Sequence, residues 1–191
     1  MENLSLKFIE EIKEIFLKTE ITDKKGKKIS LTESLKRIKD LIKKIKRENK
    51  TVIFIGNGGS ASVSSHKSLD FWRNLKVKTM FFSDYSRLTC LSNDEGYEKV
   101  YSLQLKDYSQ KGDVLIAISS SGKSKNILQA VEEMKKKGNQ VITFSGFSPF
   151  NPLRKKGDIN FYSPCFCYNK VEAIHLLLCD LILESLENEL R

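Results

Sequence analysis

The sequence predicts an α/β fold in which a doubly wound, five-stranded parallel sheet is flanked by helices. The main observation is that short, continuous apolar segments alternate with longer segments of helical periodicity. A second observation is that Gly-rich and Ser-rich segments directly follow two of the apolar segments. A third is size, because 191 residues that are 40% hydrophobic and 30% charged suffice for one compact domain and exclude a disordered or collagen-like chain.

Two amphipathic helices are expected before the first strand. Apolar residues recur at helical spacing within residues 4–18 and again within residues 32–45. A polar segment around Gly26 separates them, and Ser30 or Thr32 is a candidate cap for the second helix. We therefore expect residues 1–50 to form an N-terminal helical extension that packs in an oligomer, and residues 51–191 to form one structural unit.

Strands and helices alternate through the rest of the chain. Continuous apolar segments, typical of strands buried on both faces, are Thr51–Ile55, Thr79–Ser83, Val114–Ile118, Val141–Phe144 and Ile159–Tyr162. Helices are expected near residues 62–74, 97–109, 124–137 and 168–189. Short connections between such elements favour right-handed crossovers and hence a parallel sheet.

Charge and composition limit the class of partner. The net charge of +9 is compatible with nucleic acid, an acidic membrane or a phosphorylated small molecule. Residues 1–50 form a basic segment whose only aromatic residues are Phe8 and Phe16, and these offer no stacking platform for nucleic-acid bases. No apolar segment reaches the roughly 18 residues that span a bilayer. We expect a small phosphorylated ligand, with neither a nucleic acid nor a membrane as partner.

The four cysteines and the N-terminus predict a cytoplasmic location. No signal-peptide pattern opens the chain, and the cysteines lack the spacing of a disulfide framework. Cys165 and Cys167 resemble half of a metal site, but no second Cys or His pair completes it.

Two loops are candidate anion sites. Gly56–Ala61 follows the first predicted strand, and Ser119–Ser124 follows the third. Both loops lie at carboxyl ends of parallel strands, where ligands bind in open α/β sheets. Glycines allow close approach of the backbone, and the helix that follows presents free N–H groups. Hydroxyls and amides in these loops, including that of Ser60, suit a phosphate or sugar oxygens.

Two other interpretations of these loops are weaker. Residues 56–61 match a variant of the dinucleotide fingerprint, with Asp84 further along, but no second substrate domain is present. Residues 117–124 nearly match a phosphate-binding loop of nucleotide hydrolases, with Ala117 in place of the first glycine.

Polar residues on two helical faces form a further candidate cluster. His66 and Asp70 are four residues apart and therefore lie on one face of a helix. Glu172, Leu176 and Asp180 follow one another at intervals of four residues and form a row on another helix. An imidazole with three carboxylates suits a divalent metal or acid–base catalysis. His175, in an apolar segment, is expected to be structural.

These residues carry a family resemblance. The segments Ile55–Ser60, Leu91–Tyr97, Gly112–Ser124 and Val171–His175 resemble the SIS (sugar isomerase) domain family, closest to its sedoheptulose 7-phosphate isomerase branch. The resemblance covers roughly residues 30–189. It implies a homotetramer and ketose–aldose isomerisation of a sugar phosphate through an enediol.

The resemblance also implies roles for individual residues. The phosphate would be held by Ser119, Ser120, Ser121 and Ser124. The sugar would be lined by Asn57, Gly58, Gly59 and Glu172, with Asn93 and Asp94 nearby. The zinc ligands would be His66, Asp70, Glu172 and Asp180, and the catalytic groups would be Asp70 and Asp180.

The sequence departs from this family at the cluster. Relatives have Glu, Gln and His where this chain has Asp70, Glu172 and Asp180, and usually Asp at Asn169. Three carboxylates near one histidine increase the need for a cation between them. The departures leave open a noncatalytic phosphosugar-binding or regulatory protein, but the retained acids favour an isomerase.

Overall fold

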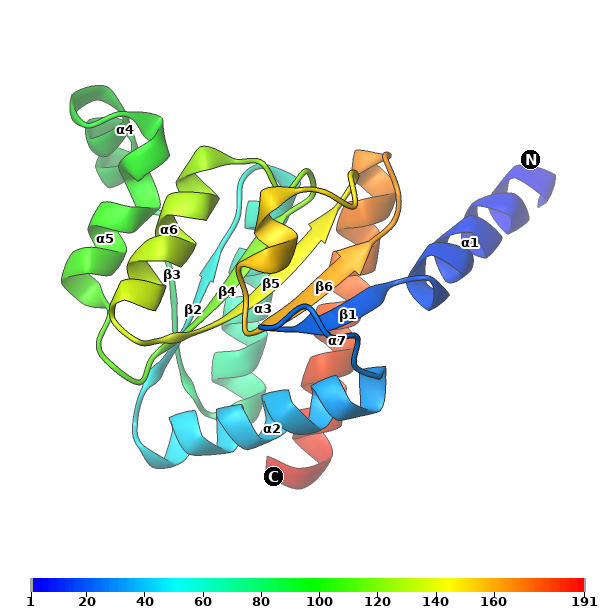
Figure 1. Cartoon of the computed structure of the whole chain (residues 1–191), viewed down its shortest axis with the longest axis horizontal. Helices are drawn as coiled ribbons and strands as arrows, with labels where there is room; N and C mark the ends of the chain where they lie inside the picture. Colours follow the sequence, from blue (N-terminus) through cyan, green and yellow to red (C-terminus); the bar gives the residue numbers. More distant parts are fainter. Residues whose placement is uncertain (1, 191) are drawn as a thin grey trace.

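The computed structural model describes residues 2–190, and its centre is a six-stranded sheet with the order β1-β6-β5-β4-β2-β3 (Figure 1). The strands are β1 (Glu20–Asp23), β2 (Thr51–Ile55), β3 (Lys78–Phe81), β4 (Val114–Ser119), β5 (Gln140–Gly146) and β6 (Ile159–Ser163). The last five are parallel to one another, which confirms the predicted doubly wound sheet.

Strand β1 extends the sheet by a sixth member and was not predicted. It pairs antiparallel with β6, with Ile21 opposite Phe161. Its four residues are too few to show a sequence period, and only Ile21 is strongly apolar. The strand forms because β6 presents an edge on which it can pair.

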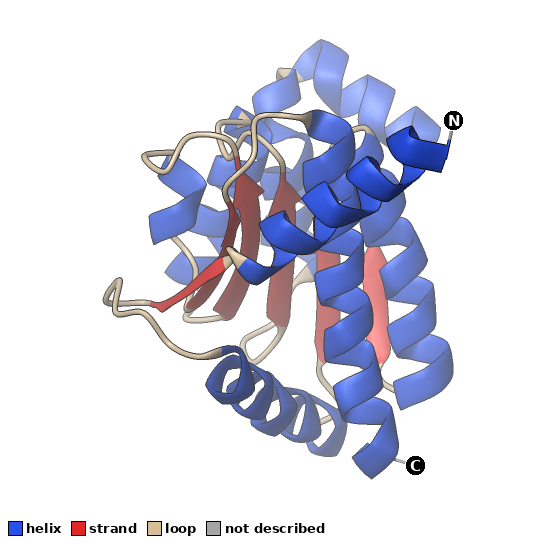
Figure 2. Ribbon diagram, turned by 90° about the vertical axis from the view of Figure 1, so that its right-hand side faces the viewer, coloured by secondary structure: helices blue, strands red, loops and turns tan. Residues whose placement is uncertain are grey.

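Helices cover both faces of the sheet (Figure 2). They are α1 (Glu2–Leu17), α2 (Leu31–Arg47), α3 (Gly59–Leu75), α4 (Tyr85–Asp94), α5 (Val100–Tyr108), α6 (Lys125–Lys136) and α7 (Tyr168–Leu190), with short 3₁₀ turns η1 (Tyr97–Lys99) and η2 (Pro152–Lys155). Helix α4 was not predicted. Asp84 caps it by accepting a hydrogen bond from the Arg87 backbone N–H at 2.7 Å.

Alternate residues of each central strand enter two separate cores. Phe54 and Phe144 face α2, α3 and α7, whereas Ile53 and Leu115 face α5 and α6. Burial on both faces explains why these strands are continuous apolar segments in the sequence.

Residues before β2 contribute to the first core. Ile38, Ile42 and Ile45 of α2 are fully buried there, and α2 packs on α7. The predicted domain boundary at residue 50 remains a prediction, although β1 and α2 share the sheet and core of the following residues. No helix among the described residues is long and apolar enough to cross a membrane.

Helix α1 projects away from the body of the molecule (Figure 1). It exposes several large apolar side chains: Leu4, Leu6, Phe8, Ile9 and Leu17. Ile12, Ile15 and Phe16 of the same helix pack against the first core, so packing within one chain explains only part of its apolar periodicity.

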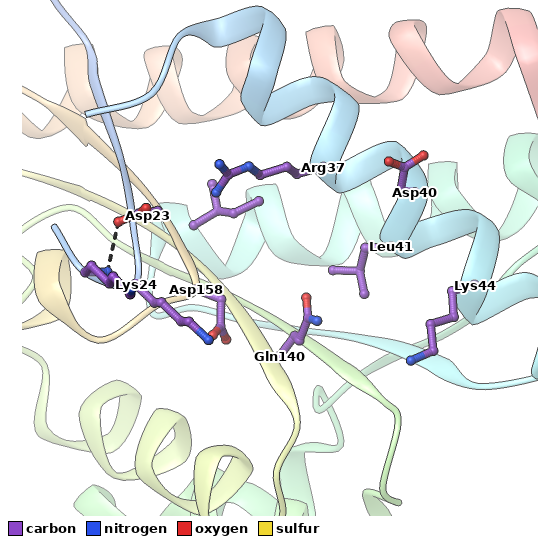
Figure 3. Close-up of a pocket in the computed structure, with 10 residues that line it drawn as sticks. Asp23, Lys24, Arg37, Asp40, Leu41, Lys44, Gln140 and Asp158 are labelled. Atoms are coloured by element: carbon purple, nitrogen blue, oxygen red, sulfur yellow. Dashed lines mark hydrogen bonds between the residues drawn. The ribbon is translucent and has the colours of Figure 1, made fainter. Parts of the chain in front are cut away.

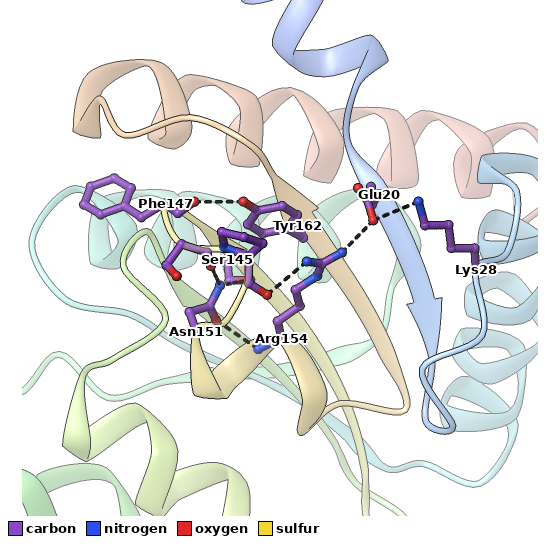
Figure 4. A network of polar contacts seen from close by, with 9 residues as sticks. Glu20, Lys28, Ser145, Phe147, Asn151, Arg154 and Tyr162 are labelled. Carbon is purple, nitrogen blue, oxygen red and sulfur yellow. Dashed lines mark hydrogen bonds and ion pairs between the residues drawn. The ribbon is translucent and has the colours of Figure 1, made fainter.

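A polar network fixes the loop after β5, next to the ends of β4 and β6 (Figure 4). Asn151 Nδ2 donates to the Gly146 carbonyl at 3.1 Å, and Asn151 Oδ1 accepts from the Arg154 backbone N–H at 3.0 Å. The Arg154 guanidinium lies over the Tyr162 ring and pairs with Glu20 of β1 at 2.6 Å. Strand β1 thus helps to position a loop beside the carboxyl edge of the sheet.

Candidate active site

The two loops predicted from the sequence meet in one pocket at the carboxyl ends of β2 and β4, which are neighbouring strands. The pocket has a volume of about 230 Å³. It is lined by Asn57, Gly58, Gly59, Ser60, Ser119, Ser120, Ser121, Ser124, Tyr168 and Glu172. Tyr168 is the lining residue that the sequence did not indicate.

Side-chain hydrogen bonds join the two loops. Asn57 and Asn126 exchange amide hydrogen bonds, each 2.9 Å long, and the hydroxyls of Ser60 and Ser120 lie 3.4 Å apart. The Tyr97 hydroxyl also donates to Asn57 Oδ1 at 3.0 Å. Asn57 therefore fixes the shape of the pocket as well as lining it.

Glycines are required where the first loop turns into α3. Gly58 has φ +53° and ψ −126°, a conformation that disfavours side chains. A Cβ atom on Gly59 would lie 2.2 Å from Glu172 Oε2. The Glu172 carboxylate thus rests against the backbone at the start of α3, inside the pocket.

The pocket suits a phosphate ester. The helices α3 and α6 both begin at its wall, and Ser124 is the N-cap residue of α6. Free N–H groups and the positive ends of helix dipoles favour an anion at such positions. Serine hydroxyls can donate to phosphate oxygens, while Glu172 can accept hydrogen bonds from sugar hydroxyls.

Tyr168, which lines the pocket, belongs to an aromatic group. The ring centroids of Phe147 and Tyr168 are 4.6 Å apart, and those of Phe147 and Phe166 are 5.8 Å apart. The Phe147 carbonyl accepts a hydrogen bond from Tyr162 at 2.8 Å. A tyrosine at the first position of α7 gives no sequence signal that distinguishes it from an ordinary surface residue.

Asn93 and Asp94 lie at the end of α4 and do not line this pocket. They are exposed, and the Asn93 amide donates to Asp94 Oδ1 at 2.8 Å. Their neighbour Tyr97 provides the contact with Asn57 instead.

The predicted acid cluster is arranged around a lysine. The Lys67 ammonium lies 2.6 Å from Asp70 Oδ2 and also forms an ion pair with Asp180 Oδ1. His66 Nε2 is 3.5 Å from the same oxygen of Asp70. Burial lowers the pKa of Lys67, but hydrogen bonds to Asp180 and Asp70 outweigh it and raise the pKa above its usual value. The lysine is therefore charged at neutral pH.

Glu172 is not part of this arrangement. It precedes Asp180 by eight residues on α7, which corresponds to about 12 Å along a helix axis. Among the described residues, no group of three or more His, Cys, Asp or Glu side chains is arranged to hold a metal. The donor set therefore does not fit the zinc site that the resemblance implied, because Lys67 lies between two of its expected ligands.

His175 is a buried structural residue, as the sequence indicated. Its Nε2 lies 3.2 Å from the Ser145 carbonyl, and its ring meets the Phe144 ring edge-on. Burial lowers the pKa of His175 to about 4, so the ring is neutral at pH 7.

A second, larger cavity of about 460 Å³ lies at the amino ends of β5 and β6 (Figure 3). Its basic residues Lys24, Arg37 and Lys44 alternate with the carboxylates Asp40 and Asp158. This mixture of charges, at the opposite ends of the strands, does not resemble the hydroxyl-lined anion pocket.

Comparison with known proteins agrees with the fold. The SIS domain profile matches residues 19–146. The phosphoheptose isomerase of Histophilus somni is 32% identical over 193 residues, which cover 96% of this chain and 97% of that protein. The chain therefore belongs to the SIS domain family, among the phosphoheptose isomerases.

Solved structures show the same fold. The phosphoheptose isomerase of Neisseria gonorrhoeae superposes with a TM-score of 0.81 at 24% identity, over 97% of this chain and 98% of that one. The corresponding enzyme of Francisella tularensis gives a TM-score of 0.83 at 18% identity, over 99% of each chain.

Proposed function

We propose that this protein isomerises a phosphoheptose, interconverting sedoheptulose 7-phosphate and the glycero-manno-heptose 7-phosphate aldose through an enediol. The observation that carries the proposal is the hydroxyl-lined pocket in a chain that matches a phosphoheptose isomerase over 96% of its length.

The phosphate is the part of the substrate for which the pocket has the most specific chemistry. Ser119, Ser121 and Ser124 present hydroxyls, and the starts of α3 and α6 present N–H groups. Binding of the phosphate end of the substrate orients the sugar, so that the carbonyl and the neighbouring carbon are held for proton transfer.

The chemical step needs a base and an acid. A carboxylate removes the proton from the carbon next to the carbonyl while the carbonyl oxygen gains a proton, which gives the enediol. Reprotonation at the neighbouring carbon, with loss of the hydroxyl proton, gives the aldose. We assign these transfers to Asp70 and Asp180, and the binding of sugar hydroxyls to Glu172. No step is derived through a metal.

The noncatalytic alternative is not favoured. The relatives that match most of the chain are named isomerases. In addition, the side chain of Asp180 is 46% exposed, although neither Asp180 nor Asp70 lines the pocket between the two loops.

Self-association and location are further parts of the proposal. The exposed apolar side chains of α1 support an oligomer, for which the resemblance implies four copies. Four free cysteines support the cytoplasm as the location.

The test measures turnover and phosphate binding separately. Transfer of solvent deuterium to the carbon next to the carbonyl, followed by NMR with sedoheptulose 7-phosphate, reports proton abstraction. Asp180→Asn is expected to abolish this exchange. Ser119→Ala with Ser124→Ala is expected to weaken calorimetric binding by more than 100-fold, since each of the two lost hydrogen bonds to a charged group contributes about 1.5–3 kcal/mol.

Ser86→Ala is the matched control, because Ser86 is exposed on α4 outside the pocket. It should leave both measurements unchanged. Absence of exchange in the unaltered protein, with intact binding of the sugar phosphate, would establish the noncatalytic alternative.

A further inference from the structure

Lys67 is a buried lysine in the middle of α3. It is 2% exposed, whereas lysines are almost never this buried unless they are paired. No local pattern marks Lys67 in the sequence, since it stands among polar residues of a helix. Its burial results from the packing of α3 on α7.

The Lys67 ammonium is shared by carboxylates from two helices. Asp70 of α3 lies one turn away on the same helix, and its Oδ2 is 2.6 Å from Nζ. Asp180 of α7 contributes Oδ1 to the same ammonium. A lysine head group is a compact point charge with three donors, so it can serve two carboxylates at once.

This geometry balances charge without a further cation. Two carboxylates at one place repel each other unless a positive group lies between them. The ammonium is that group, and the carboxylates in turn satisfy a cation that would otherwise be buried without a partner. Removing either kind of partner leaves an uncompensated charge.

We propose that Lys67 is a positioning residue whose ammonium occupies the place of a divalent metal between Asp70 and Asp180, so that the acid pair is oriented without metal. The assignment of catalysis to this pair rests on the proposed function. The claim that the lysine, and not a metal, joins the two carboxylates does not.

The first experiment titrates zinc chloride into the chelator-treated protein by calorimetry. We expect no zinc binding that depends on Asp180, and no loss of turnover after treatment with a chelator. Binding of one zinc per chain that disappears in Asp180→Asn would overturn the proposal.

The second experiment removes the ammonium with Lys67→Met. The two carboxylates and the adjacent His66 then lack their cation, and we expect zinc to raise the Tm of this variant but not that of the unaltered protein. Without metal, kcat should fall about 100-fold, the effect of a misplacement of about 1 Å. The acid limb of the pH profile of kcat/KM should move up by about one unit, because like charges favour protonation of one partner.

Two further variants separate charge from packing. Lys67→Arg keeps the positive charge and should keep the unaltered pH profile, with part of the activity. Lys156→Met is the control, because it removes a lysine ion pair, 2.7 Å from Glu132, away from the cluster. An unchanged pH profile and no zinc response in folded Lys67→Met would refute the role of Lys67.

If Lys67→Met does not fold, Lys67→Met combined with Asp180→Asn removes one ammonium and one carboxylate together. Recovery of folding in this double variant would support the charge pairing, and continued failure to fold would contradict it. The zinc titration needs no substrate, so absence of turnover in every variant would refute the proposed function while leaving the inference about Lys67 testable.

Discussion

Acidification should destabilise the protein through His175. Burial holds the pKa of this imidazole at about 4, against 6.5 for an ordinary histidine. The unfolded chain takes up the proton near pH 6.5, whereas the native protein does not until about pH 4. Stability contributed by the neutral ring is therefore complete above pH 6.5 and is lost progressively as the pH falls toward 4.

The magnitude follows from the difference in pKa. One unit corresponds to about 1.4 kcal/mol, so the full loss is about 3 kcal/mol and the loss between pH 7.5 and pH 5 is about 2 kcal/mol. Urea unfolding of the protein at these two pH values, at one protein concentration, measures the change in free energy of unfolding.

His175→Gln provides the comparison. Its amide can still donate to the Ser145 carbonyl but takes up no proton in this range. The two proteins share their carboxylates and His66. The difference between them in the pH dependence of the free energy of unfolding therefore reports the contribution of His175 alone. Equal losses of stability between pH 7.5 and pH 5 would refute the assignment to His175.

Two further changes test the pocket and the first helix. Gly59→Ala places a Cβ atom 2.2 Å from Glu172 Oε2, so the carboxylate must move away. Because the displaced group is the end of a flexible side chain, we expect Tm to change little. The kcat/KM of Gly59→Ala should fall as much as that of Glu172→Gln. Normal kinetics in Gly59→Ala beside impaired Glu172→Gln would contradict this. Leu6→Glu with Ile9→Glu places charges on side chains that are 65% and 62% exposed in one chain, and light scattering should show a smaller assembly. An unchanged mass would remove α1 from the oligomer contact.

The pocket loops were predictable because their signal is local. The loop Gly56–Ala61 directly follows one continuous apolar segment, and Ser119–Ser124 follows another. The position of a loop after a buried parallel strand places it at the carboxyl edge of the sheet, where ligands bind. Local spacing also placed His66 beside Asp70 on one face of a helix.

Other contacts of the site had no such signal. The spacing of Lys67 and Asp70 permits an ion pair on one helix, but nothing local distinguishes it from a solvated pair. Tyr97 and Asn57 are far apart in sequence, and their contact depends on how α4 and η1 return to the sheet. Strand β1 likewise depends on the free edge of β6.

Periodicity and loop chemistry in the sequence thus determined the parallel sheet and the anion pocket, because each depends on residues close together in the chain. Only the tertiary structure decided what lies between Asp70 and Asp180, which are more than one hundred residues apart in the chain. The packing of α3 on α7 excludes water from the Lys67 side chain and brings both carboxylates to one ammonium. Burial and long-range charge pairing are properties of the folded chain, and no local pattern encodes them.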